Sequence, residues 1–430
     1  MGEAAKISLK AIGKQDSYLL SDNPDESFFN YTTDKRHSNF RKYHRNRSII
    51  KPGDATPNWP FNKTIKVEFN PRNMGDLLSN MYLSITIPGI SDGNYADQLG
   101  RHILKSVTMF VDDIEVEKLH DDWGILYDEL YLEVSEKVAN RFLINRNLGF
   151  DDAPTTPSVA QYDADLVIPL HFFFSRKFAS DEYTSNTPNR PYFPVCSILR
   201  QKIEFEFEFH EQTFFTDTTN TVTLPSFNIV TEEITVSPEE RNFFTSQRQT
   251  LITDLVRKHP VIASDLNDDI IKNNLVPNIP VKCIHWFLRN TKFEDEGDAV
   301  GVPVPSTTGE RLYQNRFNFS SALASFFING NRLPNVTKTD HSYYKYLIPY
   351  QKRLARPIRN IYTYSFSMNP VNVEPSGNLD FSQIQSEKTN IEVKLDTSII
   401  DITTETFSLH MYYTGYQTFV FENGFMSVAY

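Results

Sequence analysis

The chain has 430 residues, a formal net charge of −11 and only two cysteines, and 13% of its residues are aromatic. This length suits two or three domains, and the 33 phenylalanines favour strands, because Phe packs well on a pleated sheet. The acidic balance excludes wholesale binding of nucleic acid. Two cysteines are too few for a disulfide-rich secreted scaffold, so Cys196 and Cys283 are expected to be reduced core thiols.

The N-terminal segment lacks the apolar stretch of a signal peptide. Lys6 stands where an N-myristoylation signal needs Ser or Thr. The chain also has no run of roughly 18 apolar residues that could cross a membrane as a helix. We therefore expect neither a leader peptide nor a transmembrane helix.

The first distinctive segment is KRHSNFRKYHRNRS at 35–48, the one basic cluster in an otherwise acidic chain. Its basic residues lie close together along the sequence. They are Lys35, Arg36, Arg41, Lys42, Arg45 and Arg47. Such a cluster is a candidate contact for an acidic partner or an anionic surface.

Four segments, at 62–69, 82–88, 202–210 and 406–413, alternate apolar and polar residues with a period of two. This period is typical of a strand with one buried and one solvated face. The clearest is KIEFEFEFH at 202–210, where three glutamates alternate with Ile and Phe. Such strands belong to antiparallel sheets, because parallel sheets are buried on both faces. A sandwich or barrel is therefore expected.

Two hairpin turns lie half a chain apart. The apolar phase flips across the Asp pair at 112–113, and the Asn-Gly pair at 329–330 is a strong hairpin signal because both residues take positive φ. The turns are 217 residues apart (329 − 112 = 217), close to half of 430. KIEFEF from Lys202 and NIEVKL from Asn390 form a second matching pair in the same order. We predict two copies of one β-domain in tandem.

Helical signals are few. WGILYDELYLEV at 123–134 repeats apolar residues at helical spacing. Ser237 as an N-cap and Pro238 at the first helical position predict a second helix at the junction between two domains. The segments 149–161 and 291–310 lack periodicity and are predicted to be long surface loops, which are usually functional or displayed.

Several motifs with possible chemistry have a simpler explanation. The Gly-Lys pair at 13–14 lacks the earlier Gly of a phosphate-binding loop. The acidic groups at 112–113 and 120–122 could bind metal or cleave sugars, but Asp is common in turns, and turns are expected there. His285 beside Cys283 has no second pair at zinc-ligand spacing, so a core histidine is expected. We predict no metal site and no cofactor.

Five asparagines stand in sequons for N-glycosylation, which matter only if the chain meets a glycosylation machinery. They are Asn30, Asn46, Asn62, Asn318 and Asn335. Because the cysteine usage indicates a reducing compartment, most are expected to be unmodified.

Segments scattered over nearly the whole chain, in conserved order, point to one family. They are GKQDSYLLSDNPDESFF from Gly13, RHSNF at 36–40, IPLHFFFSR from Ile168, SPEERNFF from Ser237, FFINGNRL from Phe326, YYKYLIPYQ from Tyr343, SFSMNPVNVEPSGNLDFSQI from Ser365 and GFMSVAY from Gly424. The most specific is the one that contains Pro375-Ser376-Gly377. Together they resemble the major capsid proteins of nucleocytoplasmic large DNA viruses, although near Gly424 that family often has several glycines and this chain has one.

The resemblance implies an all-β fold of two tandem eight-stranded jelly-roll sandwiches (a double jelly roll), with a few short helices in loops and the linker. It implies an N-terminal arm at 1–26, a first jelly roll at 27–236 and a second at 237–430. It further implies a structural protein and not an enzyme. Three copies would form a pseudo-hexameric capsomer of an icosahedral shell, assembled in the host cytoplasm and located in the virion.

The resemblance also implies partners: the homotrimer, neighbouring capsomers, minor capsid proteins and an internal viral membrane, with no specific nucleic acid. The basic cluster would then face inward, toward minor capsid proteins or anionic lipid, where each basic residue contributes about 1 kcal/mol. Its alternative is a solvated strand flank without a partner.

Two other functions stay open. One is a minor capsid or scaffold protein of the same fold. The other is a carbohydrate-binding β-sandwich protein or glycosidase, which needs an aromatic-lined cleft with two carboxylates about 5–10 Å apart. The chain has three tryptophans, which fit core or hairpin positions and form no platform for a sugar.

Overall fold

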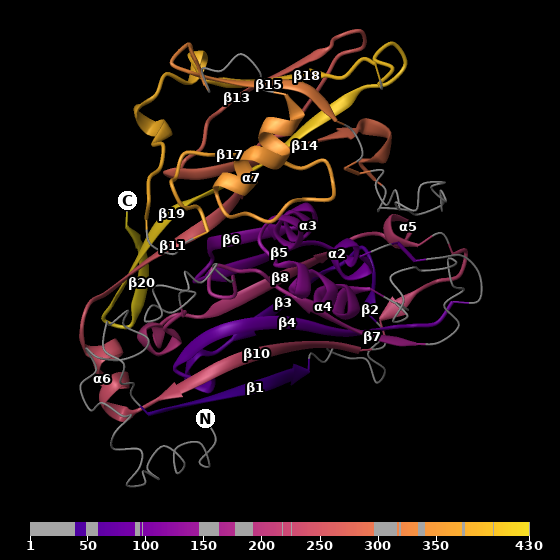
Figure 1. The fold of residues 1–430 in the computed structure, drawn as a ribbon. Coiled ribbons are helices and arrows are strands. Elements are labelled where there is room, and N and C mark those ends of the chain that lie inside the picture. The colour runs from indigo at the N-terminus through magenta and orange to yellow at the C-terminus, as the bar shows by residue number, and fades with distance from the viewer. Residues whose placement is uncertain are drawn as a thin grey trace.

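The computed structural model describes residues 39–48, 59–90, 95–96, 98–145, 163–176, 192–216, 218–224, 226–295, 316–317, 320–333, 340–371, 375–398 and 400–429. Within these ranges the chain forms mostly antiparallel sheets. They are arranged as two halves, one above the other in Figure 1.

The first half is a sandwich of two four-stranded sheets (Figure 1). One sheet, in spatial order, contains β1 (Phe40–Ser48), β10 (Ser226–Val236), β4 (Leu77–Ile87) and β7 (Ala164–Pro169). The other contains β3 (Thr64–Phe69), β8 (Ile203–Phe209), β5 (Leu104–Val111) and β6 (Ile114–His120). A short pair, β2 (Trp59–Pro60) and β9 (Thr223–Leu224), accompanies them.

The second half repeats this arrangement. One sheet, in spatial order, contains β11 (Gln249–Lys258), β19 (Phe407–Glu422), β14 (Val281–Asn290) and β17 (Tyr362–Ser365). Two short strands, β12 (Ile262–Ala263) and β20 (Phe425–Ala429), also pair with β19. The other sheet contains β13 (Ile270–Asn274), β18 (Asn390–Leu395), β15 (Ser321–Ile328) and β16 (Asn331–Leu333).

The two halves correspond strand for strand. The order β1-β10-β4-β7 matches β11-β19-β14-β17, and β3-β8-β5-β6 matches β13-β18-β15-β16. The matching peptides KIEFEF and NIEVKL lie in β8 and β18, which occupy the same place in their sheets. The predicted all-β double jelly roll is therefore confirmed, and so are the four predicted strand segments, which lie in β3, β4, β8 and β19.

Both predicted hairpins are confirmed and are also equivalent. Val111 pairs with Ile114 across the first turn, and Ile328 pairs with Asn331 across the second. The two central residues of each turn have positive φ, at 48° and 66° in the first and at 51° and 81° in the second. Two-residue turns of this kind match the right-handed twist of the flanking strands. The repeat therefore extends from strand order to turn geometry.

Helices occupy the connections between strands. They are α2 (Leu99–Ile103), α3 (Asp121–Leu130), α4 (Val134–Ile144), α5 (Gln212–Phe215), α6 (Pro238–Ser246) and α7 (Ile348–Gln351). Single turns are η4 (Pro71–Asn73), η5 (Val195–Ile198), η6 (Thr291–Phe293), η7 (Tyr343–Leu347), η8 (Phe381–Gln383) and η9 (Ser386–Lys388).

Both predicted helices exist, but their bounds were predicted with different accuracy. α6 has the predicted N-cap, because Ser237 Oγ accepts a hydrogen bond from the backbone N–H of Glu240 at 3.3 Å. The helix predicted at 123–134 starts two residues earlier and ends at Leu130. A separate helix that the sequence pattern did not reveal, α4, starts at Val134.

The prediction of one solvated face fails for 406–413. β19 is buried on both faces over its first ten residues, and every residue of β14 is buried. One face packs within the second half, where the Trp286 ring lies 5.4 Å from Phe326. The other face packs on the first half, where the Trp123 ring lies 6.1 Å from Tyr412. The sheet β11-β19-β14-β17 is thus an internal layer of the molecule.

One hydrophobic core runs through both halves. The main cluster of buried apolar side chains includes residues from both. Ring contacts cross the boundary, with Phe173 5.4 Å from Phe419 and Phe193 6.0 Å from Phe421. Among the described residues, no helix has the length and apolar character needed to cross a bilayer.

Candidate functional site

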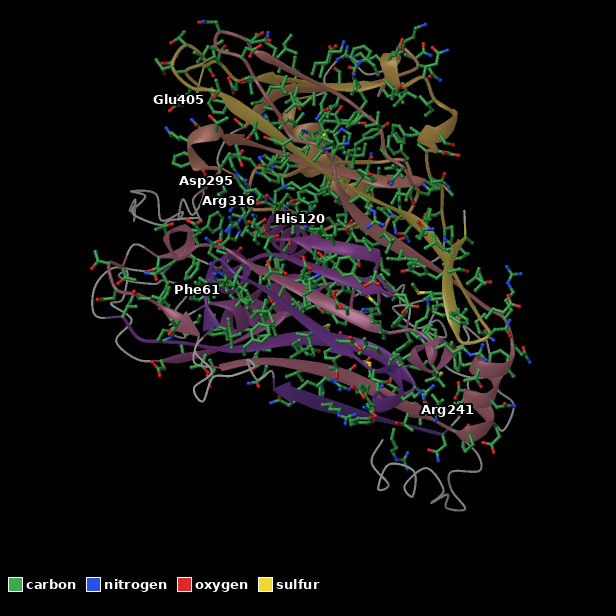
Figure 2. The ribbon with its side chains drawn as sticks, turned by 180° about the vertical axis from the view of Figure 1, so that it is seen from behind. Phe61, His120, Arg241, Asp295, Arg316 and Glu405 are labelled. Atoms are coloured by element: carbon green, nitrogen blue, oxygen red, sulfur yellow. The ribbon has the colours of Figure 1, made fainter. Side chains whose placement is uncertain are left out.

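A polar cleft of about 830 Å³ lies at the boundary between the two halves. The first half contributes His120, Asp121 and Asp122 from the end of β6 and the start of α3. The second half contributes charged residues that include Arg316 and Asp295. Figure 2 shows Arg316, Asp295 and His120 near this boundary in the view from behind. This cleft, called the seam cleft below, is lined mostly by titratable side chains.

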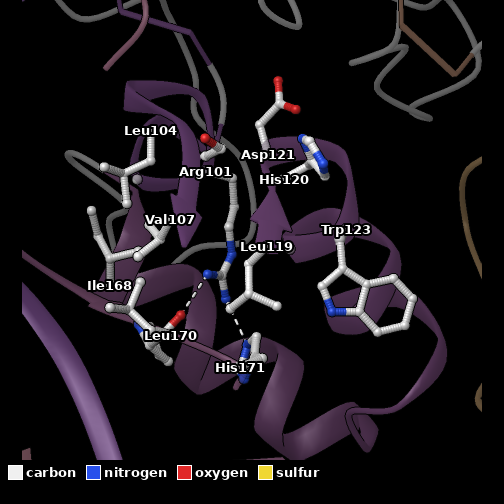
Figure 3. Close-up of a pocket in the computed structure, with 14 residues that line it drawn as sticks. Arg101, Leu104, Val107, Leu119, His120, Asp121, Trp123, Ile168, Leu170 and His171 are labelled. Carbon is white, nitrogen blue, oxygen red and sulfur yellow. Dashed lines mark hydrogen bonds between the residues drawn. The ribbon is translucent and has the colours of Figure 1, made fainter. Parts of the chain in front are cut away.

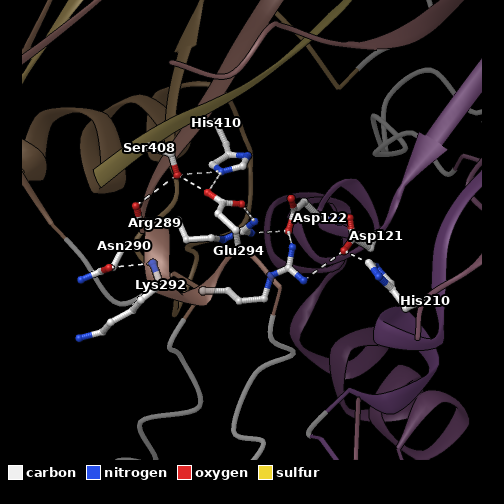
Figure 4. Close-up of polar contacts among 10 residues, drawn as sticks. Asp121, Asp122, His210, Arg289, Asn290, Lys292, Glu294, Ser408 and His410 are labelled. Carbon is white, nitrogen blue, oxygen red and sulfur yellow. Dashed lines mark hydrogen bonds and ion pairs between the residues drawn. The ribbon is translucent and has the colours of Figure 1, made fainter. Parts of the chain in front are cut away.

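The two aspartates at the start of α3 bind arginines of the second half (Figure 4). Asp122 Oδ1 accepts hydrogen bonds from Arg289 Nη2 at 2.7 Å and from Arg316 Nη2 at 2.9 Å. Asp121 Oδ2 lies 3.2 Å from Arg316 Nη1 and 3.0 Å from His210 Nε2. The turn predicted at 120–122 is therefore wrong, because these acids open a helix and face partners that are distant in sequence.

The pKa values of both aspartates follow from this environment. Burial raises the pKa of each carboxyl, and the nearby guanidinium groups lower it by more, so that both pKa values lie below the ordinary value. The effect is greatest at Asp121. Both groups are therefore ionised at neutral pH and cannot act there as general acids.

Glu294 is one of the second-half residues that line the seam cleft, and it contacts Arg289 and His410 (Figure 4). Its Oε2 accepts a hydrogen bond from Arg289 Nη1 at 3.0 Å, and its Oε1 lies 2.8 Å from His410 Nε2. Burial raises the pKa of Glu294, but the contacts with His410 and Arg289 lower it by more, so that the pKa lies well below the ordinary value. Glu294 follows η6, so the start of the loop predicted at 291–310 packs into the boundary. Residues 296–310, like the predicted loop 149–161, lie outside the described residues.

A second group of charged residues, around Glu117 and Arg176, connects the two halves in the interior of the molecule. Glu117 on β6 is fully buried and pairs with Arg176. Glu117 also accepts hydrogen bonds from the backbone N–H groups of Phe173, at 2.9 Å, and of Val256 on β11, at 3.0 Å. Arg176 donates a hydrogen bond to the carbonyl oxygen of Asp254 at 2.7 Å, and the Asp254 carboxylate pairs with Lys282.

A smaller pocket lies within the first half (Figure 3). Its volume of about 30 Å³ is room for about one water molecule. Arg101 donates two hydrogen bonds to Asp128, at 2.8 and 2.9 Å, and its Nη2 lies 2.9 Å from His171 Nε2. Burial raises the pKa of Asp128, but Arg101 and His171 lower it to about 2. The pocket holds a paired charge and is too small for a substrate.

These groups are arranged to connect parts of the fold. Six of these acids lie beside an arginine, a lysine or a histidine: Glu117, Asp121, Asp122, Asp128, Asp254 and Glu294. Within the described ranges, no group of three or more His, Cys, Asp or Glu side chains could hold a metal ion. The structural effect of the seam cleft and of the Glu117–Arg176 group is to join the two jelly rolls.

The part of the predicted basic cluster that the structure describes, Arg41 to Arg47, lies in an edge strand. β1 pairs with β10 and lies at one edge of its sheet, at the bottom of Figure 1. Arg41 and Lys42 are exposed, whereas Arg47 is half-buried and pairs with the buried Glu233 at 2.5 Å. Lys42 lies 3.3 Å from Glu232, and Arg45 donates a hydrogen bond to the carbonyl oxygen of Asn73. The cluster is thus partly neutralised by its own sheet.

The remaining predicted residues are distributed as follows. Lys35, Arg36, Asn30, Asn318 and Asn335 lie outside the described residues. Asn46 is exposed on β1. Asn62 is exposed, and its side-chain amide donates a hydrogen bond to Glu211 Oε1 at 2.8 Å. Glycosylation of these asparagines stays a prediction.

The cysteines and His285 are core residues, as predicted. Both thiols are buried and form no disulfide, and burial raises the pKa of Cys196 to about 12 and that of Cys283 to about 11. His285 is buried between the Tyr131 hydroxyl, at 3.0 Å, and the Thr363 hydroxyl, at 2.9 Å. Burial lowers its pKa to about 3. The Gly-Lys pair at 13–14 lies outside the described residues.

The sequence interpretation missed the charged residues that join the halves. Arg289 and Lys282 stand in VKCIHWFLRN, a mostly apolar and fully buried strand. A charged residue in such a strand needs a buried partner, since an unpaired buried charge is costly. That signal was present in the sequence, but it does not name the partner.

Two family models match consecutive parts of the chain. Residues 27–237 match the major capsid protein N-terminus, and residues 239–427 match the large eukaryotic DNA virus major capsid protein. Together the two matches cover both jelly rolls.

Curated relatives cover almost the whole chain. The major capsid protein of Pyramimonas orientalis virus is 22% identical over 410 residues, which is 90% of this chain and 91% of the relative. The major capsid protein of Paramecium bursaria Chlorella virus 1 is 22% identical over 424 residues, which is 92% of this chain and 88% of the relative.

Among solved structures, a capsid chain from the quasi-atomic model of the PBCV-1 virus capsid has the same fold. Its TM-score is 0.72 at 17% identity, with 93% of this chain and 98% of that chain covered. The sequence resemblance is confirmed by the two consecutive family matches and by the relatives of similar length. The chain therefore belongs to the family of major capsid proteins of large eukaryotic, or nucleocytoplasmic, DNA viruses.

Proposed function

We propose that three copies of this chain form a pseudo-hexameric capsomer that paves an icosahedral virus shell. The supporting observation is the strand-for-strand equivalence of the two jelly rolls. A cyclic trimer of such chains presents six similar sandwiches, so its outline approximates a hexagon that can tile a surface. Family membership supports the location in the virion capsid and contacts with neighbouring capsomers. Assembly in the host cytoplasm belongs to the same proposal.

Two further parts of the proposal concern organisation and chemistry. The chain divides into an arm at 1–26, a first jelly roll at 27–236 and a second at 237–430. It acts as a structural protein without catalytic activity. The pairing of the described buried acids with basic groups supports this, because the ion pairs of Asp122 with Arg289 and Arg316 hold the halves together.

The oligomeric state tests the proposal directly. Light scattering on the purified chain is expected to give three times 49.7 kDa, about 149 kDa. Negative-stain electron microscopy of the same sample is expected to show a six-sided outline. A monomer or dimer at micromolar concentration, or a particle of threefold outline with no hexagonal approximation, contradicts the proposal.

We also propose that β1, with the basic residues before it, contacts an acidic partner at the inner face of the shell. The partner would be a minor capsid protein or the headgroups of an internal membrane. The exposure of Arg41 and Lys42 on an edge strand supports this. Basic residues near an anionic surface contribute about 1 kcal/mol each, and less when a carboxylate such as Glu232 lies beside them.

A triple variant, R41Q/K42Q/R45Q, tests this contact. Co-sedimentation with vesicles of anionic lipid is expected to weaken at least tenfold, because three positive charges are lost. The matched control is K66Q/K272Q/K394Q, which removes three surface lysines that also lie beside carboxylates. The proposed role of β1 is contradicted if both variants lose vesicle binding equally. It is also contradicted if R41Q/K42Q/R45Q binds vesicles as the wild type does and gives a normal yield of particles.

A further inference from the structure

Helix α4 presents its apolar side to solvent. Val134, Val138, Phe142 and Leu143 are exposed, and Val134 is 78% exposed. The first three follow each other at intervals of four residues and therefore lie on one side of the helix. The buried residues of α4 are Asn140 and Ile144. A surface helix of a globular protein normally has the opposite arrangement, with its apolar side inward.

Hydrogen bonds hold α4 in this orientation. The helix begins with a capping box, in which the backbone N–H of Glu133 donates to Glu136 Oε2 at 3.1 Å. On the inward side, Lys137 Nζ donates to the carbonyl oxygens of Glu129, at 2.6 Å, and of Arg356, at 3.3 Å. The inward groups of α4 are thus engaged by the fold, and the apolar side is left for another contact.

The second half extends the same surface. Tyr346, Leu347, Tyr350 and Ile358 are exposed, with Tyr350 at 84% and Ile358 at 72%. Their segment is held against the end of α3, where the backbone N–H of Ile358 donates to Glu129 Oε2 at 2.8 Å. Figure 1 shows α4 and α7 on the same side of the molecule. We name these eight side chains the α4–α7 surface.

The size of the α4–α7 surface exceeds what a monomer normally exposes. Three of the eight residues are aromatic, with about 150–250 Å² each when whole, and the five aliphatic ones are somewhat smaller, so their exposed fractions correspond to on the order of 800 Å². The largest apolar patch on a typical monomer is about 300–600 Å². Each partner in a stable protein interface buries about 800 Å². The area is therefore that of one side of a permanent contact.

We propose that the α4–α7 surface is covered by a second copy of this chain within the capsomer. This inference rests on the proposed trimer. Each copy carries a net charge of −11, so identical chains repel each other least where they meet through uncharged side chains. Permanent contacts between copies are also more apolar than contacts that form later between finished assemblies. In a closed ring, the α4–α7 surface meets a different surface of the neighbouring copy.

The variant V138E/F142E tests the assignment. It places two charges on the outward side of α4, and the fraction of trimer at micromolar concentration is expected to fall at least tenfold. The circular dichroism of the monomer is expected to be unchanged, because both side chains are exposed within the chain. The matched control is I114E/L266E, which places two charges at exposed apolar residues outside the α4–α7 surface and is expected to leave the trimer intact.

A photoreactive residue at position 142 identifies the occupant. With p-benzoylphenylalanine in place of Phe142, irradiation is expected to join two chains covalently and give a product of about 99 kDa, twice 49.7 kDa. A crosslink within one chain, or to a different protein, overturns the inference. So does a V138E/F142E variant that remains trimeric. A wild-type chain that is not trimeric contradicts the proposed function itself, so that the two failures are distinguishable.

Discussion

Replacing Glu117 with Ala is expected to lower the free energy of unfolding by about 3–5 kcal/mol. The Glu117 carboxylate is fully buried between the halves and pairs with Arg176. Without it, the Arg176 charge has lost its carboxylate partner, and the backbone N–H groups of Phe173 and Val256 lose their acceptor. Urea unfolding at a fixed protein concentration measures the change, since association shifts apparent stability.

A double-mutant cycle separates the lost pair from the lost packing. E117A/R176M is expected to be more stable than E117A, because the unpaired charge is no longer present. E115A is the matched control, since Glu115 is exposed on the same strand, and a change within about 0.5 kcal/mol is expected there. If E117A destabilises no more than E115A, the boundary group does not hold the halves together.

Acidification is expected to destabilise the fold steeply at pH values above those at which ordinary carboxylates become protonated. Burial, as the largest cause, lowers the pKa of His102 and His285 to about 3 and that of His120 and His171 to about 4. In the unfolded chain these histidines titrate near 6.5. Between these values the unfolded chain binds about four more protons than the folded chain, so stability falls as pH decreases from about 6.5 toward 4, by about 5 kcal/mol per pH unit at the steepest.

The variant H285Q tests the origin of this slope. Gln can keep hydrogen bonds to the hydroxyls of Tyr131 and Thr363, but it takes up no proton. The slope of unfolding free energy between pH 6 and 4.5 is expected to decrease by about 1.4 kcal/mol per pH unit. Urea unfolding across this range measures it. An unchanged slope means that His285 is not kept neutral by the fold.

The features predicted correctly from the sequence depend on short-range signals. The alternation of apolar and polar residues in 202–210 predicts the bounds of β8 to within a few residues, because successive side chains of a strand point to opposite faces of the sheet. The turns at 112–113 and 329–330 follow from local positive φ, and their separation revealed the duplication. A signal of this kind needs no knowledge of the partner strand.

The errors arise where a distant part of the chain changes the environment. The segment 406–413 alternates like a half-solvated strand, but the first half covers its second face. The acids at 120–122 look like turn residues because Arg289, which neutralises Asp122, stands 167 positions away. Helix α4 was not predicted, and its local pattern does not reveal that its apolar residues face outward.

The buried double-sided sheet β11-β19-β14-β17 limits how the gene can be recombined. A second jelly roll transferred alone to another capsid chain brings with it the face that packs on Trp123 and Phe173. A foreign first half must reproduce the ring contacts, the Asp122 carboxylate that pairs with Arg289, and the Glu117 carboxylate that accepts a hydrogen bond from the backbone N–H of Val256. Natural exchange between related viruses is therefore expected to replace the whole open reading frame or the exposed loops, and to leave the junction between the halves in one parental combination.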